Sequence, residues 1–487
     1  MTRMPASRAR AAGAALVLLA GLAGLAPAAG GQGPPEPEVS IVKVTGARAD
    51  DPSAAGEQAE TALSAGEVDG ARIVTLAYND VRPSDKLQFT PEGRTINDGA
   101  SLMGWSSSRD GGATWRQSEL LTPPPGWFML WGDPALARSP RDPRLVFLSN
   151  LAGVAPPAGA PLGPQLAGAC IARSTDGGVE FAVVQCLSNE RDFYDGGTMA
   201  ADSRGRVYAA YWNTTRQRVD VWAAPDEQSP FTLLPTPFPG SAYQHPRLRV
   251  DPVTDDLFVA SLRMDNHVHL ARWRPGEGWS KPVSASPGPV VPSNNAPVGS
   301  YGMRYAWRFS FDVRGDADGP ALRVVYVAQS PDEPRRTVLR AAGCAATLEG
   351  CRELPLGPSY ASEPLFPFNP DVLAYRAPGA KVGWTLTYSG EVGGAVGLYE
   401  APMALEAQHR ELVAPRPACS DTRIGGGYWG DYDQLAPLGV DGGRLLLAQG
   451  FTDSSLGCTV QWRNWAQHTH VSLARFAPLD QGAPVQR

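Results

Sequence analysis

The chain has 487 residues, of which 53 are glycine and 46 are proline, and a formal net charge of −6 at pH 7. The negative charge argues against nucleic acid as the main partner, because such proteins present an excess of lysine and arginine. The many glycines and prolines, without any long amphipathic helical pattern, favour an all-β protein with many turns.

Residues 1–28 have the pattern of a secretory signal peptide. A basic start with Arg3, Arg8 and Arg10 precedes the apolar run 14–26, and Ala26-Pro27-Ala28 offers a cleavage site. The run is too short for a stable membrane anchor, and no later segment is apolar enough for a membrane span. We therefore expect a secreted monomer, extracellular or periplasmic, with a Pro/Gly-rich linker at 29–37.

Short apolar strands recur along the chain, each after a turn of glycine, aspartate or proline. Seven copies occur, at 71–76, 145–148, 207–211, 257–260, 324–327, 382–386 and 445–448. Each has a second strand just upstream, so the pairs are typical of the inner strands of four-stranded blades. We predict a seven-bladed β-propeller over 38–477 and a C-terminal tail at 478–487; six blades are the alternative. The segment 39–44 should close the ring as the outer strand of the last blade and hide the sheet edges.

Two stretches share the pattern S-x-D-x-G-x-x-(W/F). They consist of Ser108, Asp110, Gly112 and Trp115, and of Ser174, Asp176, Gly178 and Phe181. In a hairpin turn the carboxylate can accept hydrogen bonds from backbone N–H groups, and glycine permits a positive φ. The pattern resembles the Asp-box, or BNR repeat, of the sialidase-like β-propellers. That resemblance implies a propeller and a relation to glycans, but we interpret the two boxes as structural turns.

The six cysteines fall into neighbouring pairs, as expected in an oxidising compartment. Two pairs flank turns, and the third would tie two loops near the C-terminal end; the predicted disulfides are Cys170–Cys186, Cys344–Cys351 and Cys419–Cys458. A metal site would need paired C-x-x-C spacing, which the sequence lacks. His267-Val268-His269 and His468-Thr469-His470 could suit a metal, yet a structural role is favoured for both. No metal and no cofactor is expected.

Aligned repeats place one residue of each blade at the entry to its inner strand. These are Glu60, Asp133, Gly197, His245, Trp307, Asn369 and Asp431. We call the face where these strands begin the channel face. A ring of acids, one histidine and one amide there is suited to a polyhydroxylated ligand or a cation. The alternative is that polar entry residues simply cap the strands.

The segments that enter this face are aromatic, and Trp-Gly-Asp occurs at 131–133 and again at 429–431. Trp131, Tyr428 and Trp429 are candidate surfaces for stacking on sugar C–H faces, although they could equally pack the loops together. Arg304 and Arg423, with Arg247 and Arg308, are expected near the same face.

The resemblance to sialidases implies an arginine triad, a Tyr–Glu nucleophile pair and an acidic acid/base. The match is incomplete, because no F-R-I-P-like segment and no glutamate partner are evident. Tyr428 or Tyr432 could replace the nucleophile, and Asp133 could replace the acid. Glycoside hydrolysis by another route needs two carboxylates, which Asp133, Asp431 and Asp433 could supply. Two hypotheses follow: a carbohydrate-active protein, either a glycoside hydrolase or a glycan binder, and a non-catalytic extracellular interaction scaffold.

Overall fold

The structure is a computed structural model, and its described residues are all strands, turns and loops. They are 39–44, 58–80, 86–90, 93–116, 118–154, 165–188, 192–240, 242–291, 308–333, 336–356, 366–376, 381–392, 395–403, 409–417, 434–441, 444–453 and 470–478. The predicted signal peptide and linker lie outside them. Within these ranges, no helix is long and apolar enough to cross a membrane.

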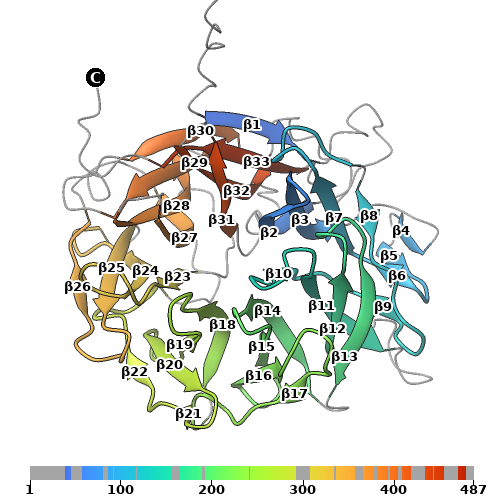
Figure 1. Ribbon diagram of the computed structural model, residues 1–487, viewed down its shortest axis with the longest axis horizontal. Coiled ribbons are helices and arrows are strands. Elements are labelled where there is room, and N and C mark those ends of the chain that lie inside the picture. The colour runs from blue at the N-terminus through green and yellow to red at the C-terminus, as the bar shows by residue number, and fades with distance from the viewer. Residues whose placement is uncertain are drawn as a thin grey trace, which may run out of the picture. The chain divides into compact units, whose positions relative to one another are not determined.

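Seven antiparallel sheets follow one another around a ring, which confirms the seven-bladed β-propeller (Figure 1). The six-bladed alternative is wrong. Each sheet takes its main strands from one repeat, in the order inner to outer, except that the last sheet takes its outer strand from the start of the chain. Such blades form because each repeat offers short apolar strands between glycine- and aspartate-rich turns.

The sheets are numbered as blades 1 to 7 along the chain, and their strands have the following bounds. Blade 1 holds β2 (Gln58–Val68), β3 (Ala71–Asp80), β7 (Met103–Ser108) and β8 (Glu119–Leu120); blade 2 holds β10 (Ala135–Arg138), β11 (Val146–Val154), β12 (Gln165–Ser174) and β13 (Ala182–Ser188), with β6 (Ala100–Ser101) and β9 (Met129–Leu130) alongside. Blade 3 holds β14 (Tyr194–Ala201), β15 (Val207–Asn213), β16 (Arg218–Ala224) and β17 (Thr232–Leu233); blade 4 holds β18 (Tyr243–Val250), β19 (Leu257–Arg263), β20 (Val268–Arg274), β21 (Gly278–Trp279) and β22 (Val283–Ser284).

The remaining strands complete the ring. Blade 5 holds β23 (Phe309–Val313), β24 (Leu322–Gln329), β25 (Thr337–Cys344) and β26 (Arg352–Leu354); blade 6 holds β27 (Phe366–Arg376), β28 (Val382–Val392), β29 (Ala395–Pro402) and β30 (Arg410–Pro417); blade 7 holds β31 (Gln434–Asp441), β32 (Arg444–Asp453), β33 (His470–Phe476) and β1 (Val39–Lys43). A separate hairpin is formed by β4 (Leu87–Thr90) and β5 (Gly93–Ile96).

The N-terminal strand closes the ring as predicted. β1 pairs antiparallel with β33, so that Val39 lies opposite Phe476 and Lys43 lies opposite Ser472. The pairing continues beyond the strand, because the N–H of Val44 donates to the carbonyl of Val471 at 3.0 Å. The outer edge of β33 is therefore covered by backbone hydrogen bonds.

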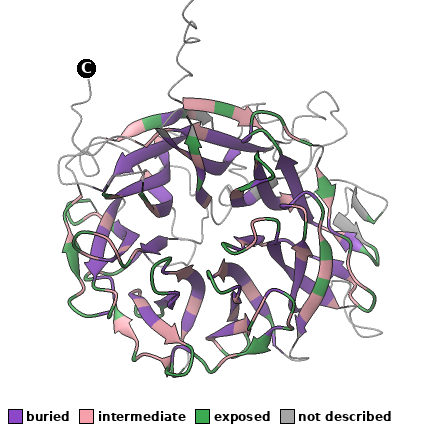
Figure 2. Cartoon of the chain, in the orientation of Figure 1, coloured by how far each residue is buried: buried purple, intermediate pink, exposed green. Residues whose placement is uncertain are grey.

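Among the described residues, an apolar cluster lies at each of the seven boundaries between neighbouring blades. Successive side chains of the second strand in each blade point to opposite faces, so this strand contributes to the apolar clusters at both boundaries of its blade. In β11, Val146 and Leu148 pack towards blade 1, whereas Phe147 packs towards blade 3. This is the period of two expected for a strand buried on both faces. The inner strands are accordingly buried in Figure 2, and exposed residues lie mainly in turns and at the rim.

Two of the three predicted disulfides are present. Cys170 and Cys186 join β12 to β13, where they are direct partners in the ladder, and Cys344 joins Cys351 across the turn after β25. Cys419 and Cys458 lie outside the described residues.

Candidate functional site

The channel face carries non-glycine residues in the left-handed backbone region at equivalent positions of four blades. Their φ angles are 58° for Glu60, 53° for Asp133, 52° for His245 and 44° for Asn369. At Glu60, His245 and Asn369, a β-bulge shifts the pairing register between the inner strand and its neighbour. Such a conformation is unusual outside glycine and costs about 1–3 kcal/mol, so the surrounding structure must hold it in place.

Blade 3 corrects one residue of the sequence alignment. Its bulge lies between Asp195 and Thr198, and the residue with positive φ there is Gly196, not Gly197. Gly196 has a φ of 54°, close to the values in the other four blades. The repeat alignment was one residue out because two glycines stand side by side at the bulge.

The acidic members of the ring are connected through Asn79, at the end of β3. Its Nδ2 donates to Oε2 of Glu60 at 2.5 Å, and its Oδ1 accepts the backbone N–H of Asp133 at 2.8 Å. Oδ2 of Asp133 in turn accepts the N–H of Gly196 at 3.3 Å. One chain of hydrogen bonds thus runs through blades 1, 2 and 3 at the channel face.

His245 and Asn369 are buried, as is Glu60, whereas Asp133 is half-buried. The ring of His245 lies 5.3 Å from that of Trp212, at the end of β15, at a tilt of 51°. Trp131 is also half-buried, and it packs against apolar clusters that include Ala100 and Met129. The described part of the site therefore combines carboxylates, an amide, an imidazole and aromatic rings.

The other predicted site residues lie outside the described residues. They are Arg304, Trp307, Arg423, Tyr428, Trp429, Asp431, Tyr432 and Asp433. Of the two further arginines expected near this face, Arg308 is buried and donates from Nη1 to the carbonyl of Val291 at 2.7 Å. Arg247 is buried as well.

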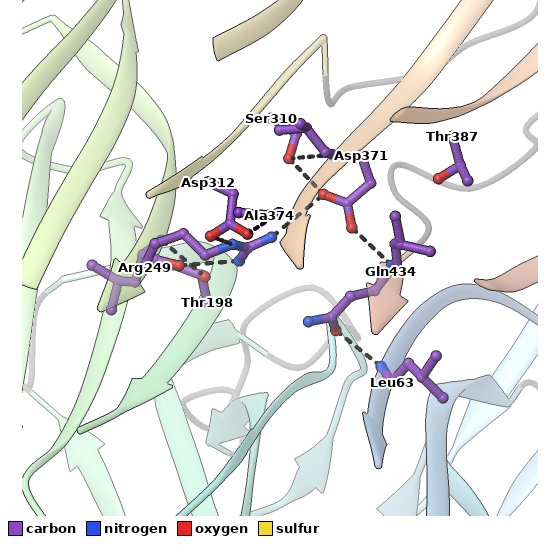
Figure 3. Close-up of polar contacts among 12 residues, drawn as sticks. Leu63, Thr198, Arg249, Ser310, Asp312, Asp371, Ala374, Thr387 and Gln434 are labelled. Atoms are coloured by element: carbon purple, nitrogen blue, oxygen red, sulfur yellow. Dashed lines mark hydrogen bonds and ion pairs between the residues drawn. The ribbon is translucent and has the colours of Figure 1, made fainter. Parts of the chain in front are cut away.

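Deeper in the ring, side chains of the innermost strands form a polar belt from blade to blade (Figure 3). Each link is a hydrogen bond from a backbone N–H to a side chain of the preceding blade: Leu248 to Thr198, Val372 to Ser310, Leu435 to Asp371, and Leu63 to Gln434. Arg249 of β18 reaches both Asp312 of β23 and Asp371 of β27, at 3.6 Å and 3.4 Å. No motif marks the residues of this belt in the sequence; the alternation of polar residues along the inner strands is the one signal for them.

The two S-x-D-x-G turns lie on the opposite face, because they bond to the turns between inner strands. The N–H of Gly111 donates to the carbonyl of Arg72, and that of Gly177 donates to the carbonyl of Arg144. Within the first turn, Oδ1 of Asp110 accepts the N–H groups of Ala113 and Thr114 at 3.0 and 2.9 Å.

The second turn repeats this pattern and also joins two blades. Oδ1 of Asp176 accepts the N–H groups of Val179 and Glu180 at 3.0 and 3.1 Å. The hydroxyl of Thr75, from blade 1, donates to the carbonyls of Gly177 and Gly178. The hydrogen bonds of the two turns stay within the turn or join it to neighbouring strands, as a structural turn requires.

The first histidine pair makes local contacts, whereas the side chains of the second pair, His468 and His470, lie outside the described residues. Nδ1 of His267 lies 3.0 Å from the carbonyl of Ser286, and Nε2 of His269 lies 3.8 Å from Oδ2 of Asp265. Burial lowers the pKa of His269. No group of three or more potential metal ligands occurs among the residues that the structure describes.

No protein-family model and no curated protein matches the chain. Solved structures do match, among them the intramolecular trans-sialidase of Ruminococcus gnavus, with 11% identity and a TM-score of 0.42 over 70% of this chain and 91% of that one. AofleA from Arthrobotrys oligospora has 13% identity and a TM-score of 0.42 over 72% and 91% of the two chains. The sialidase of Trypanosoma rangeli has 9% identity and a TM-score of 0.38, and the match covers 70% of this chain and 54% of that protein.

Likeness at this level concerns the fold alone, and the blade count rests on the chain's own seven sheets. Fold does not determine activity, because propellers carry many unrelated sites. The chain is a seven-bladed β-propeller that resembles the sialidases in fold.

Proposed function

We propose that the protein is an exported, carbohydrate-active propeller that binds its glycan at the channel face. The observation that carries this proposal is the set of polar residues held at positive φ in equivalent blades, Glu60, Asp133, His245 and Asn369. Bulges in this position turn side chains away from the ladder, and they are common beside binding sites. Convergent polar groups around one mouth suit a ligand with many hydroxyls.

The chemistry of the site fits a sugar in two respects. Carboxylate and amide oxygens accept hydrogen bonds from hydroxyl groups. Trp131, two residues before Asp133, and Trp212, whose ring lies 5.3 Å from that of His245, offer half-buried aromatic rings for stacking. Asp133, half-buried and held through Asn79, is the described candidate for a catalytic acid. Its partner in a hydrolase would be Asp431 or Asp433, with Tyr432 as an alternative nucleophile, and all three are proposals from the sequence.

Export is supported by the two disulfides, because such bonds persist in oxidising compartments. A second function, a non-catalytic interaction scaffold, is favoured by a different observation. Glu60, Asn79, Asp133 and Gly196 form one chain of hydrogen bonds, which would also serve to hold blades 1, 2 and 3 together.

One experiment separates these functions. The purified mature protein is given a panel of sialosides, neutral glycosides and polysaccharides, and both product release and binding heat are measured. Asp133→Asn is compared with Asp69→Asn, which lies in the β2–β3 turn on the opposite face and pairs there with the exposed Arg144. Both aspartates have positive φ, and asparagine tolerates that conformation, so the two variants keep their backbones alike.

Release or binding that is lost in Asp133→Asn and retained in Asp69→Asn supports the proposal. Release identifies a glycoside hydrolase, and binding without release identifies a glycan binder. If the folded protein neither binds nor cleaves any member, the carbohydrate proposal is wrong and the scaffold is favoured.

A further inference from the structure

The centre of the ring holds a group of three charged side chains from three blades. Nε of Arg249 lies 3.6 Å from Oδ1 of Asp312, and its Nη2 lies 3.4 Å from Oδ1 of Asp371. Figure 3 shows Arg249 extended from β18 between the two carboxylates, which come from β23 and β27. The side chain of Asp371 is 1% exposed and that of Asp312 is 11% exposed.

The charges in this group do not balance. One guanidinium faces two carboxylates, so one negative charge is left over where little water can solvate it. A buried site of low polarity disfavours an uncompensated charge, and taking up a proton removes it. Asp312 is the more exposed of the two acids, so solvent protons can reach it.

Three further arginines lie on β18, on β24 and on the segment before β23, and two of them donate to backbone carbonyls. Arg323 of β24 stands directly opposite Asp312 in the ladder, but its guanidinium lies 4.7 Å over the ring of Trp384 and donates to the carbonyl of Met403. Arg308, on the segment leading into β23, donates to the carbonyl of Val291. Arg247 lies on β18, two residues before Arg249, and is buried.

We propose that the contact between Arg249 and Asp312 is a pH-sensitive link at the ring centre. It is formed in neutral medium, and it is lost when Asp312 takes up a proton from solvent in mildly acidic medium. Arg249 then keeps Asp371, so blade 4 loses its ionic connection to blade 5 and retains the one to blade 6. This pH-sensitive contact does not depend on the proposed glycan function.

The pKa of Asp312 agrees with this geometry. Burial raises the pKa of Asp312 to about 6, although Arg249 and the N–H groups of Ala374 and Val313 act to lower it. These two N–H groups donate to the Asp312 carboxylate at 2.7 and 2.9 Å, and a protonated carboxyl can still accept them. The change at acidic pH is thus confined to the ion pair.

The test is a carboxyl NMR titration of the full mature protein labelled with ¹³C at aspartate, from pH 4 to 8. One aspartate signal should titrate with a midpoint near pH 6, and it should be absent in Asp312→Asn. The Nε–H signal of Arg249 should move with the same midpoint. Asp316→Asn removes a half-buried carboxylate that pairs with Arg314 and Arg376, and it should leave the midpoint unchanged.

Two variants give opposite shifts that a merely structural pair would not produce. Arg249→Gln removes the attracting charge and should raise the midpoint, whereas Asp371→Asn removes the repelling charge and should lower it. Because asparagine matches aspartate in shape, Asp371→Asn remains informative if Arg249→Gln does not fold. A midpoint below pH 4.5 in the wild type, or a midpoint that Asp371→Asn leaves unchanged, overturns the proposal.

Discussion

Gly132 leaves room for the carboxamide of Asn79, since a Cβ atom on Gly132 would lie 2.2 Å from Oδ1 of Asn79. The Cβ would also lie 2.7 Å from Cγ of Asn79, so glycine is needed here to leave space for that side chain. The glycine of the Trp-Gly-Asp sequence is thereby explained by a contact between blades 1 and 2.

The Gly132→Ala variant should displace Asn79 and with it the hydrogen bonds to Glu60 and Asp133. We expect the free energy of unfolding to fall by about 1–3 kcal/mol, the usual effect of overpacking, and glycan binding to weaken. Gly288→Ala is the control, because a Cβ there meets only the hydroxyl of Tyr326 at 3.6 Å. Urea unfolding of both proteins checks this; equal stability of the two variants would contradict it.

Gly178→Ala should loosen the boundary between blades 1 and 2. Gly178 has a φ of 91°, and a Cβ on it would lie 2.1 Å from Oγ1 of Thr75. We expect the free energy of unfolding to fall by roughly 2–5 kcal/mol, because backbone strain and overpacking add together. Gly276 has a φ of 87°, and a Cβ on it would meet no atom within 4 Å. The Gly276→Ala variant should therefore show only the loss of stability that comes from backbone strain. If thermal unfolding gives both variants the same loss, the contact with Thr75 is not tight.

Asp176→Asn should destabilise the protein at neutral pH more than at acidic pH. Burial raises the pKa of Asp176, but hydrogen bonds from Ser174, Glu180 and Val179 outweigh it, and the pKa lies below its ordinary value of 3.8. An acid with a lowered pKa in the folded state stabilises it above the unfolded pKa, and this contribution disappears as the pH falls through the folded pKa. The penalty of the variant should therefore be complete at pH 6 and shrink below pH 3.8. Urea unfolding at pH 6 and pH 3 measures it, and a constant penalty would show that the charge of Asp176 plays no part.

Removal of the Cys170–Cys186 disulfide should cost more stability than removal of Cys344–Cys351. The first bond spans 16 residues and the second spans 7. Loop-closure entropy in the unfolded chain then predicts losses of about 3 and about 2 kcal/mol respectively. Double alanine variants, unfolded without reductant, provide the measurement. The reverse order would mean that packing of the sulfur atoms, rather than chain entropy, decides the effect.

The sequence was sufficient for the blade count because the pattern repeats. A run such as Leu145-Val146-Phe147-Leu148 is buried on both faces, and seven such runs require seven sheets. The outer strand β1 could also be predicted, since Val39–Lys43 alternates as a strand and the last blade lacked one. Local spacing likewise predicted Cys170–Cys186, which face each other across a hairpin.

The site was less predictable, because its contacts join blades that are distant in sequence. The equivalent entry residues Glu60, Asp133, His245 and Asn369 could be aligned, but their left-handed backbone depends on bulges that sequence does not reveal. Asn79 ends an apolar strand and carries no motif of its own. Arg249 and Asp371 are separated by 122 positions, and they meet because the inner strands of all blades face the centre of the ring. A polar residue within an inner strand is the one sequence signal for such contacts.

The antiparallel pairing of Val39 with Phe476 places the first and last described residues of the propeller's sheets on neighbouring strands. The propeller is thus a circle that the chain completes without a covalent bond, and its seam is a hydrogen-bond ladder in blade 7. In a closed ring of blades, the point where the two chain ends meet can lie in any blade. A chain permuted so that it opens at the exposed turn around Gly276, with 39 and 476 linked, would trace the same seven sheets and carry its seam in blade 4 instead.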